Sequence, residues 1–356
     1  MKSISVITQK ALTLLGLFLI FSNLNAQNFA LDFDGSDDVL SITDDPALQP
    51  AGNFTLEAWI YPTNSTKQLQ RIISKFDGSS AGNDSGSIYW DVFDGSGALG
   101  LRAGIANSGD VFTTTPTTGA ILTLNTWQHV ALVFDQGVFT IYLNGVSQIS
   151  ADLGETSIVD NAVDWGIGGE GNSAITSAAF DGLIDEVRIW HSARTPEQLI
   201  AFKDVELNGG EPGLAAYYNF SDGAGDDTVP DVSGNGNAGT LINMDNATDY
   251  VAATHSVGAP GTLDVTSPSV TISSSDAATN SPYMVDISFD EEVVNFDIDD
   301  ITITNGFVED LASSNDQDFV ATVYPITDGN VSISIPALRA TDLTGNGNAA
   351  SNSYSY

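Results

Sequence analysis

The sequence predicts an all-β protein built from two β-sandwich domains. Short runs rich in apolar and aromatic residues recur along the 356-residue chain, and turn residues separate them at short spacing, as is typical of sandwiches. Only one segment carries a convincing helix pattern. Near residue 262 the aromatic density falls while Thr, Ser and Asp become more frequent, which indicates that a second domain begins there.

Four strands are expected in the first region, because each run combines apolar, aromatic and β-branched residues. The first run stops at Pro62, and the third leads into Asn144-Gly145, the strongest short signal for a β-hairpin. The expected strands are Phe54–Tyr61, Trp127–Phe134, Phe139–Leu143 and Leu183–Trp190.

One short surface helix is expected from about residue 196 to residue 203. Thr195 offers an N-cap, Pro196 suits the first helical position, and Gln198 stands where its side chain can return to the cap. Leu199–Phe202 supplies the apolar side of this helix.

The second region alternates apolar and polar residues, which predicts strands with one buried and one exposed face. About 90 residues with this pattern suit an immunoglobulin-like sandwich. We therefore expect a first domain at 27–262, a short stiff linker at 263–268 and a second domain at 269–356. The clearest strands of the second domain are Val285–Phe289, Ile301–Ile303 and Val331–Ile335.

The N-terminal 26 residues have the pattern of a signal peptide. Lys2 and Lys10 supply positive charge, the apolar run Ala11–Phe21 follows, and Ala26 is a small residue at the expected cleavage site. The apolar run is shorter than the roughly 20 residues that span a bilayer. We expect cleavage after Ala26 and a secreted, extracellular or cell-surface protein that does not insert into a membrane.

The charge is strongly acidic, with 10 Lys and Arg against 46 Asp and Glu and a net charge of −36. Such a surface repels nucleic acid and anionic membranes, and it suits divalent cations. Solubility alone is the simpler explanation of the acidic excess. Since the chain has no cysteine, packing or a bound metal must replace the disulfides that exported proteins often use.

Five segments of the first region occur in a characteristic order: Ala30–Val39, Phe54–Tyr61, Trp127–Ala131, Tyr142–Val146 and Phe180–Trp190. In combination they resemble the laminin G-like, concanavalin A-like lectin type of jelly roll found in bacterial surface proteins. Leu214–Phe220 and Asp231–Asn237 usually precede the first strand in this family, but here they follow the expected helix. The resemblance implies a permuted jelly roll in which the last segment returns to complete the sheet.

The second region carries Ser288–Val294, Asp300–Gly306, Val323–Pro325, Asp328-Gly329 and Asp342–Asn348. These segments resemble a bacterial Ig-like repeat of large adhesins. The resemblance implies a stalk or spacer role. Because such modules normally occur in longer arrays, a fragment of a longer adhesin or enzyme is one interpretation of the chain.

Acidic residues crowd the first strand and its turn at Asp32, Asp34, Asp37 and Asp38. Calcium takes six to eight oxygen ligands from carboxylates, carbonyls and water, so we expect a calcium site that includes Asp32, Asp34 and Asp38. The alternative is that Asp-Gly simply forms the turn.

Asp185 is a further candidate metal ligand. On a regular strand it shares one face with Leu183, Val187 and Ile189, which predicts a carboxylate among core residues. A buried carboxylate must be paired, hydrogen-bonded or bound to metal. Arg188 is expected on the opposite face, so calcium and a hydrogen bond to a neighbouring loop remain the two interpretations.

Tyr89, Trp90 and Trp165 are the candidate sugar-binding residues, because they lie beside Gly-rich turns. Partial burial at a sheet edge is the alternative for all three.

Catalysis has little support in the sequence. The three histidines have no metal-ligand spacing, and no expected strand carries the alternating acids of jelly-roll glycosidases. We therefore predict a non-catalytic binding or adhesion module that recognises glycan or protein ligands at the cell surface or matrix. The alternatives are a polysaccharide-degrading enzyme or its carbohydrate-binding accessory region, and a structural adhesin segment.

Overall fold

The computed structural model describes most of the chain after the expected signal peptide. Residues 1–26 lie outside the described residues. The described ranges are 28–49, 52–76, 86–94, 99–106, 112–155, 158–171, 178–223, 225–255, 257–258, 264–275 and 281–355. Within these ranges, no helix is long and apolar enough to cross a membrane.

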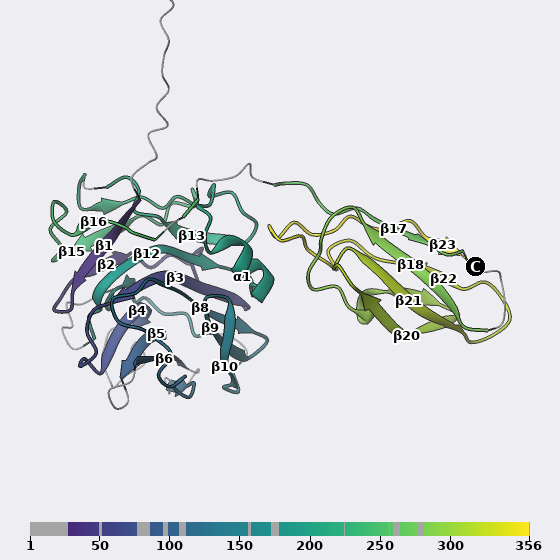
Figure 1. The fold of residues 1–356 in the computed structure, drawn as a ribbon, viewed down its shortest axis with the longest axis horizontal. Coiled ribbons are helices and arrows are strands. Elements are labelled where there is room, and N and C mark those ends of the chain that lie inside the picture. The colour runs from purple at the N-terminus through teal and green to yellow at the C-terminus, as the bar shows by residue number, and fades with distance from the viewer. Residues whose placement is uncertain are drawn as a thin grey trace, which may run out of the picture.

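The first domain is a sandwich of two antiparallel sheets, each with eight strands among the described residues (Figure 1). Sheet A contains, in spatial order, β10 (Val146–Asp152), β9 (Val138–Leu143), β8 (Gln128–Asp135), β3 (Phe54–Pro62), β12 (Asp181–Trp190), β1 (Phe29–Asp34) and β16 (Tyr250–Ala252), and β13 (Leu214–Tyr218) pairs with β12. Sheet B contains β14 (Thr228–Val229), β15 (Gly239–Ile242), β2 (Val39–Ile42), β11 (Trp165–Ile167), β4 (Leu69–Phe76), β5 (Gly86–Asp94), β6 (Leu99–Ala106) and β7 (Phe112–Thr114). The predicted all-β fold class is confirmed.

The core of this domain lies between the two sheets, and alternate residues of each strand enter it. On β5 the core residues are Ile88, Trp90 and Val92, and on β6 they include Leu101 and Ala103. The residues between them in sequence, such as Tyr89 and Asp91, therefore lie on the outer face of sheet B. This alternation places polar side chains of β5 and its neighbouring strands together on the outer face.

The predicted hairpin and the predicted return of the last segment are both present. Asn144 and Gly145 join β9 to β10 with φ of 51° and 79°, the left-handed conformations that a two-residue hairpin turn requires. The segment after the helix supplies β13, which pairs with β12, β15, which pairs with β2, and β16, which pairs with β1.

The expected regular alternation of β12 is wrong, because the strand contains a β-bulge. Its register with β3 shifts between Asp185 and Arg188, and Glu186 between them has a φ of 52°. The extra residue moves the core face from Ile184 before the bulge to Val187 after it. Asp185 therefore points to the outer face of sheet A, the same face as Arg188.

The predicted helix is confirmed as α1 (Pro196–Phe202). Thr195 caps it through a capping box with Gln198, which satisfies two of the free N–H groups at its start. Leu199 packs against Ala131, Val133 and Tyr142, so α1 covers the outer face of sheet A.

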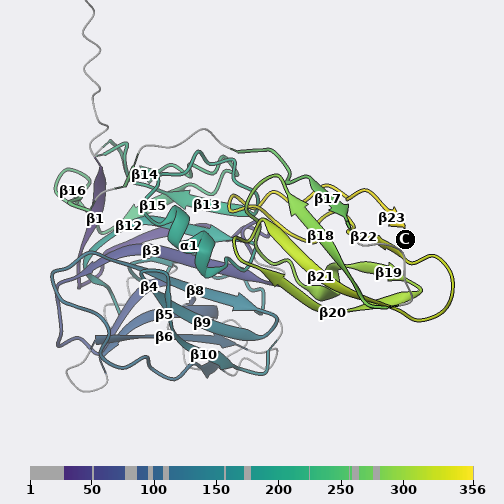
Figure 2. The same ribbon diagram turned by 45° about the vertical axis from the view of Figure 1, so that its right-hand side comes forward.

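The second domain is a smaller sandwich with its own core. One of its sheets contains β17 (Val270–Ser273), β18 (Tyr283–Phe289), β21 (Asp318–Pro325) and β20 (Gly306–Ser313), and the other contains β19 (Thr302–Thr304), β22 (Ser332–Ser334) and β23 (Tyr354–Ser355). A 3-10 turn, η1 (Ile298–Asp300), precedes β19. Figure 2 shows this domain beside α1. The expected domain limits at residues 262 and 269 stay predictions.

Candidate functional site

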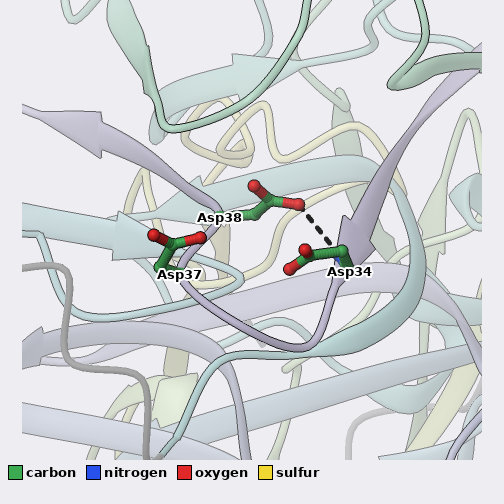
Figure 3. Close-up of side chains that lie close together, drawn as sticks. All are labelled: Asp34, Asp37 and Asp38. Atoms are coloured by element: carbon green, nitrogen blue, oxygen red, sulfur yellow. Dashed lines mark hydrogen bonds between the residues drawn. The ribbon is translucent and has the colours of Figure 1, made fainter.

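The acidic turn between β1 and β2 gathers three carboxylates. The side chains of Asp34, Asp37 and Asp38 each place an oxygen within 4.8 Å of the others, as Figure 3 shows. The main-chain N–H of Asp34 donates to Asp38 Oδ2 at 2.9 Å, and that of Ser36 donates to Asp34 Oδ1 at 2.7 Å. These hydrogen bonds hold the carboxylates over one tight loop.

The acidic turn combines crowded carboxylates with one lysine, because Lys67 Nζ donates to the main-chain oxygen of Gly35 at 2.5 Å. Burial and the nearby carboxylates of Asp34 and Asp249 raise the pKa of Asp38 to about 6, although the Asp34 N–H opposes the shift. Burial and the carboxylates of Asp249, Asp181 and Asp34 also raise the pKa of Asp32. Like charges that crowd in this way favour the protonated form of each carboxyl group.

The structure brings together only part of the predicted metal set. Asp34 and Asp38 lie in the cluster, and Asp37 takes the place expected for Asp32. Asp34 pairs across the sheet with Asp181, and Asp185 lies four residues farther along β12, which is about 13 Å. One ion cannot bind both Asp34 and Asp185.

Asp185 is buried, as expected, but its surroundings do not resemble a calcium site. The Glu186 N–H donates to its Oδ1 at 2.7 Å, and its Oδ2 lies 3.4 Å from Nε2 of His255. Burial, reinforced by the charge of Glu186, raises the pKa of Asp185 well above its ordinary value. The printed contacts of Asp185 are thus a main-chain N–H and a histidine rather than further oxygen ligands.

Two of the three predicted sugar-binding aromatic residues lie in the core. Trp90 and Trp165 are both 0% exposed and belong to the cluster between the sheets. Neither ring presents a face to solvent. Tyr89, on the opposite side of β5 from Trp90, lies on the outer face of sheet B.

Tyr89 belongs to a polar cluster centred on Asp91. Arg71 of β4 and Arg102 of β6 are the direct cross-strand neighbours of Asp91. Arg71 forms an ion pair with Asp91 Oδ1, and Arg102 Nη2 donates to Oδ2 at 2.9 Å. Arg71 also lies 3.2 Å from an oxygen of Glu170. Opposite charges on neighbouring strands therefore neutralise one another on this face.

Tyr89 is only 8% exposed, and its ring packs within this cluster. Its cross-strand partner is Gly104, where any Cβ would overlap the ring. The guanidinium carbons of Arg71 and Arg102 lie 4.6 and 5.3 Å from the ring centre, within cation–π range. Burial raises the pKa of the Tyr89 hydroxyl, which therefore stays a hydrogen-bond donor.

Arg102 is the most accessible charge of the cluster. Its side chain keeps 20% of its surface exposed, and its guanidinium lies 4.4 Å from the ring centre of the half-buried Phe93. Planar cationic and aromatic groups on one face can stack on a ligand and donate hydrogen bonds to it. We define Tyr89, Asp91, Phe93 and Arg102, with Arg71 beneath, as the arginine face.

Most of the arginine face was not predicted from the sequence. Asp91 and Arg102 are single charged residues within apolar strands, a signal that a residue-by-residue search for paired charges could have used. Gly104 inside a strand also signals the close approach of another group.

A second acidic group joins the expected linker to the second domain. Asp264, Glu291 and Asp342 place oxygens within 4.8 Å of one another. Burial, with the charges of Asp342, Asp264 and Asp290, raises the pKa of Glu291 to about 7. Asp342 Oδ1 accepts the N–H groups of Gly345 and Asn346 at 2.6 and 2.9 Å, as expected for a turn residue.

Several solved structures are similar to part of the chain. A candidate carbohydrate binding protein from Bacteroides ovatus is 24% identical, with 61% of this chain and 58% of that chain covered and a TM-score of 0.48. Domain 4 of the extracellular arabinanase AbnA from Geobacillus stearothermophilus, in complex with arabinotriose, is 20% identical over 48% of this chain and 75% of that one, with a TM-score of 0.37. The CBM40 domain of the Ruminococcus gnavus IT-sialidase, bound to α2,3-sialyllactose, is 15% identical over 48% and 96%, with a TM-score of 0.39. This chain thus spans less than two thirds of the length of the Bacteroides ovatus protein.

Two family models match the chain, in the order that the sequence resemblance implies. Residues 34–200 match the model of the concanavalin A-like lectin/glucanases superfamily, and residues 264–356 match that of a bacterial Ig-like domain. The two matches fall on the two sandwiches seen in the structure. The chain is therefore similar, over these two regions in order, to the concanavalin A-like lectin/glucanases superfamily and to bacterial Ig-like domains.

Proposed function

We propose that this chain is an exported, non-catalytic module that binds extracellular glycans through the arginine face of its first domain. The observation that carries the proposal is the placement of the partly exposed Phe93 and Arg102 together on the outer face of sheet B, beside the buried Tyr89, in a domain that matches the model of a superfamily that includes lectins. Aromatic rings stack on the C–H faces of sugars, and a guanidinium donates hydrogen bonds to their hydroxyl groups. A surface protein that displays a suitable glycan is the corresponding partner.

Binding rather than hydrolysis is favoured by the carboxylates of this face. Glycoside hydrolysis needs two carboxyl groups roughly 5 to 9.5 Å apart on either side of the scissile bond. Asp91 and Glu170 both contact the single guanidinium of Arg71. Two carboxylates that both contact one arginine are poorly placed to lie on either side of a glycosidic bond. This supports a non-catalytic role for the arginine face.

Calcium at the acidic turn is part of the proposal. The crowded carboxylates of Asp34, Asp37 and Asp38 support it, as does the absence of cysteine from an exported chain. A ligand that binds only the native state raises its stability by about 2.7 kcal/mol at 100-fold saturation. Export itself rests on the N-terminal sequence, whose charged start and short apolar run are typical of a signal peptide.

The binding proposal is tested by screening the full-length protein on a glycan array. We expect specific binding to a small set of glycans, and no cleavage when the bound glycans are incubated with the protein and analysed by mass spectrometry. No glycan bound above background would overturn the proposal. Cleavage that disappears on replacing one carboxylate would establish an enzyme instead.

The calcium proposal is tested by thermal melts in calcium and in chelator. We expect calcium to raise the melting temperature of the wild type and to have a much smaller effect on Asp34→Asn. The control Asp222→Asn, at an exposed position, should respond as the wild type does. Identical wild-type midpoints in calcium and chelator would rule out a stabilising calcium site.

A further inference from the structure

Three cavities meet where the two domains adjoin. Among the described residues, cavities of about 590, 330 and 200 Å³ lie around the start of α1. Asn295 of the second domain lines all three. The largest has the volume of a typical small-ligand site, which is about 300 to 1,000 Å³. We call this largest cavity the junction groove.

Direct contacts hold the domains together beside the junction groove. Arg194 Nη2 donates to the main-chain oxygen of Leu343, and Gln198 Nε2 donates to that of Asp342, each at 3.4 Å. The oxygen of the Gln198 side chain in turn accepts the N–H of Thr195. The residues that start α1 therefore also contact the second domain, and Asn295 adds a wall residue to a groove that the first domain otherwise lines.

The walls of the junction groove combine apolar surface with hydrogen-bonding groups. Val133, Val138 and Ala193 supply aliphatic surface, and Tyr142 supplies an aromatic ring. The polar groups alternate with them and come from both domains: Asp135, Gln136, Thr140, Thr195 and Asn295. Such a surface suits a ligand that presents hydroxyl groups and C–H faces in turn.

Arg194 places a buried cation beside the junction groove, with its guanidinium directed toward the smallest of the three cavities. It is only 3% exposed, and its guanidinium lies 4.2 Å from the ring centre of Trp190. Among the described residues, no carboxylate forms an ion pair with it. The carboxylates of Glu57, Glu211 and Asp342 act on it only from a greater distance.

The charges on the groove favour a neutral ligand. Asp135 and Glu197 both act electrostatically on Tyr142, so an anionic ligand would meet two carboxylates there. Arg194, on the same cavity wall, opposes a cationic ligand. Charges of opposite sign on one groove therefore disfavour both anionic and cationic ligands.

We infer that the junction groove is a second saccharide site, formed by both domains and selective for neutral oligosaccharides. The inference rests on the proposed glycan-binding function and adds a site distinct from the arginine face. It also gives the Ig-like domain a part in recognition, because Asn295 completes the groove.

The test uses isothermal titration of the full-length protein with cellotriose, mannotriose and galactotriose as neutral probes. Val138→Trp fills the groove from an exposed strand position, and Val146→Trp is its matched control on the neighbouring strand. Asn295→Asp removes the amide donor while keeping a residue that tolerates its φ of 61°. Asn125→Asp, at an exposed position with a φ of 52°, is its control.

We expect at least one probe to bind, Val138→Trp to weaken that binding tenfold or more, and Asn295→Asp to weaken it severalfold. Both controls should stay within twofold of the wild type, and all variants should melt as the wild type does. A wild type that binds none of the probes overturns the inference. Binding that Val138→Trp leaves unchanged also overturns it, but leaves the proposed glycan-binding function standing.

Discussion

A buried charged network organises the outer face of sheet A at the scale of single residues. Glu57 accepts from Trp190 Nε1 at 2.7 Å and lies 3.1 Å from Nε2 of His129. Arg188 lies 3.7 Å from Glu57, and its Nη2 donates to Glu186 at 2.6 Å. Buried charges are tolerated only when they are paired in this way.

The first prediction concerns the carboxylate of Glu57. Burial opposes its charged form, but the hydrogen bond with His129 and the charges of Arg188 and Arg194 outweigh burial and lower its pKa to about 2. Removing one partner of a buried ion pair costs about 3 to 5 kcal/mol. We expect Glu57→Gln to lower the free energy of unfolding by about that much, measured by denaturant titration with tryptophan fluorescence.

The same change should alter the pH dependence of stability. The folded pKa of Glu57 lies below its ordinary value of 4.5, so its stabilisation is complete above pH 4.5 and is lost as the pH falls towards 2. Glu57→Gln should show a smaller loss of stability over this interval than the wild type. Glu155→Gln, at a partly exposed loop position, serves as the control, and equal pH profiles for all three proteins would contradict the assignment.

The strands were easier to predict from the sequence than the face on which each of their side chains lies. Tyr89 was predicted as a ligand residue and lies on the arginine face, but Trp90 and Trp165 belong to the core. Sequence proximity to glycine does not reveal which side of a strand faces the second sheet. The cross-strand neighbours of Asp91 were equally hidden, because the register of β4, β5 and β6 is set by tertiary pairing.

Secondary-structure elements were predicted correctly where interactions between adjacent residues determine them. The capping box of α1 and the Asn144-Gly145 hairpin each depend on a few adjacent residues, and both are confirmed. The bulge of β12 has no such local signal, since Glu186 is not a residue that favours a positive φ. The predicted face of Asp185 was wrong for that reason.

The N-cap of α1 should contribute measurably to the stability of the first domain. Thr195 accepts the N–H of Gln198 through its side chain, and loss of an N-cap costs about 1 kcal/mol. We expect Thr195→Ala to destabilise the first domain by about that amount. Chemical denaturation followed by tryptophan fluorescence reports on this domain, because all five tryptophans lie in it.

Thr228→Ala is the matched control for the cap, at an exposed strand position, and should change the stability by less than about 0.5 kcal/mol. A loss no larger in Thr195→Ala than in Thr228→Ala would mean that the capping box contributes nothing to stability.

At the scale of the whole molecule, the sequence was sufficient to predict two sandwiches and their order. It did not predict that Arg194 and Gln198 contact the second domain, because contacts between domains leave no periodic pattern in either one. A simple spacer role for the Ig-like domain does not account for these contacts or for Asn295 at the junction groove.

The proposed glycan binding depends most on the arginine face, and therefore on Arg102. Hydrogen bonds to charged groups contribute about 1.5 to 3 kcal/mol, which corresponds to roughly 10- to 150-fold in affinity. Asp91 keeps Arg71 as a partner when Arg102 is replaced, so the fold should survive the change. Arg339→Ala, at an exposed position of the second domain, is the control.

The most direct measurement is the Kd of the full-length protein for the glycan that binds most strongly on the array, compared between the wild type and Arg102→Ala. We expect Arg102→Ala to bind at least about tenfold more weakly, while Arg339→Ala binds as the wild type does. An unchanged Kd in a folded Arg102→Ala protein would contradict the claim that the arginine face binds the glycan.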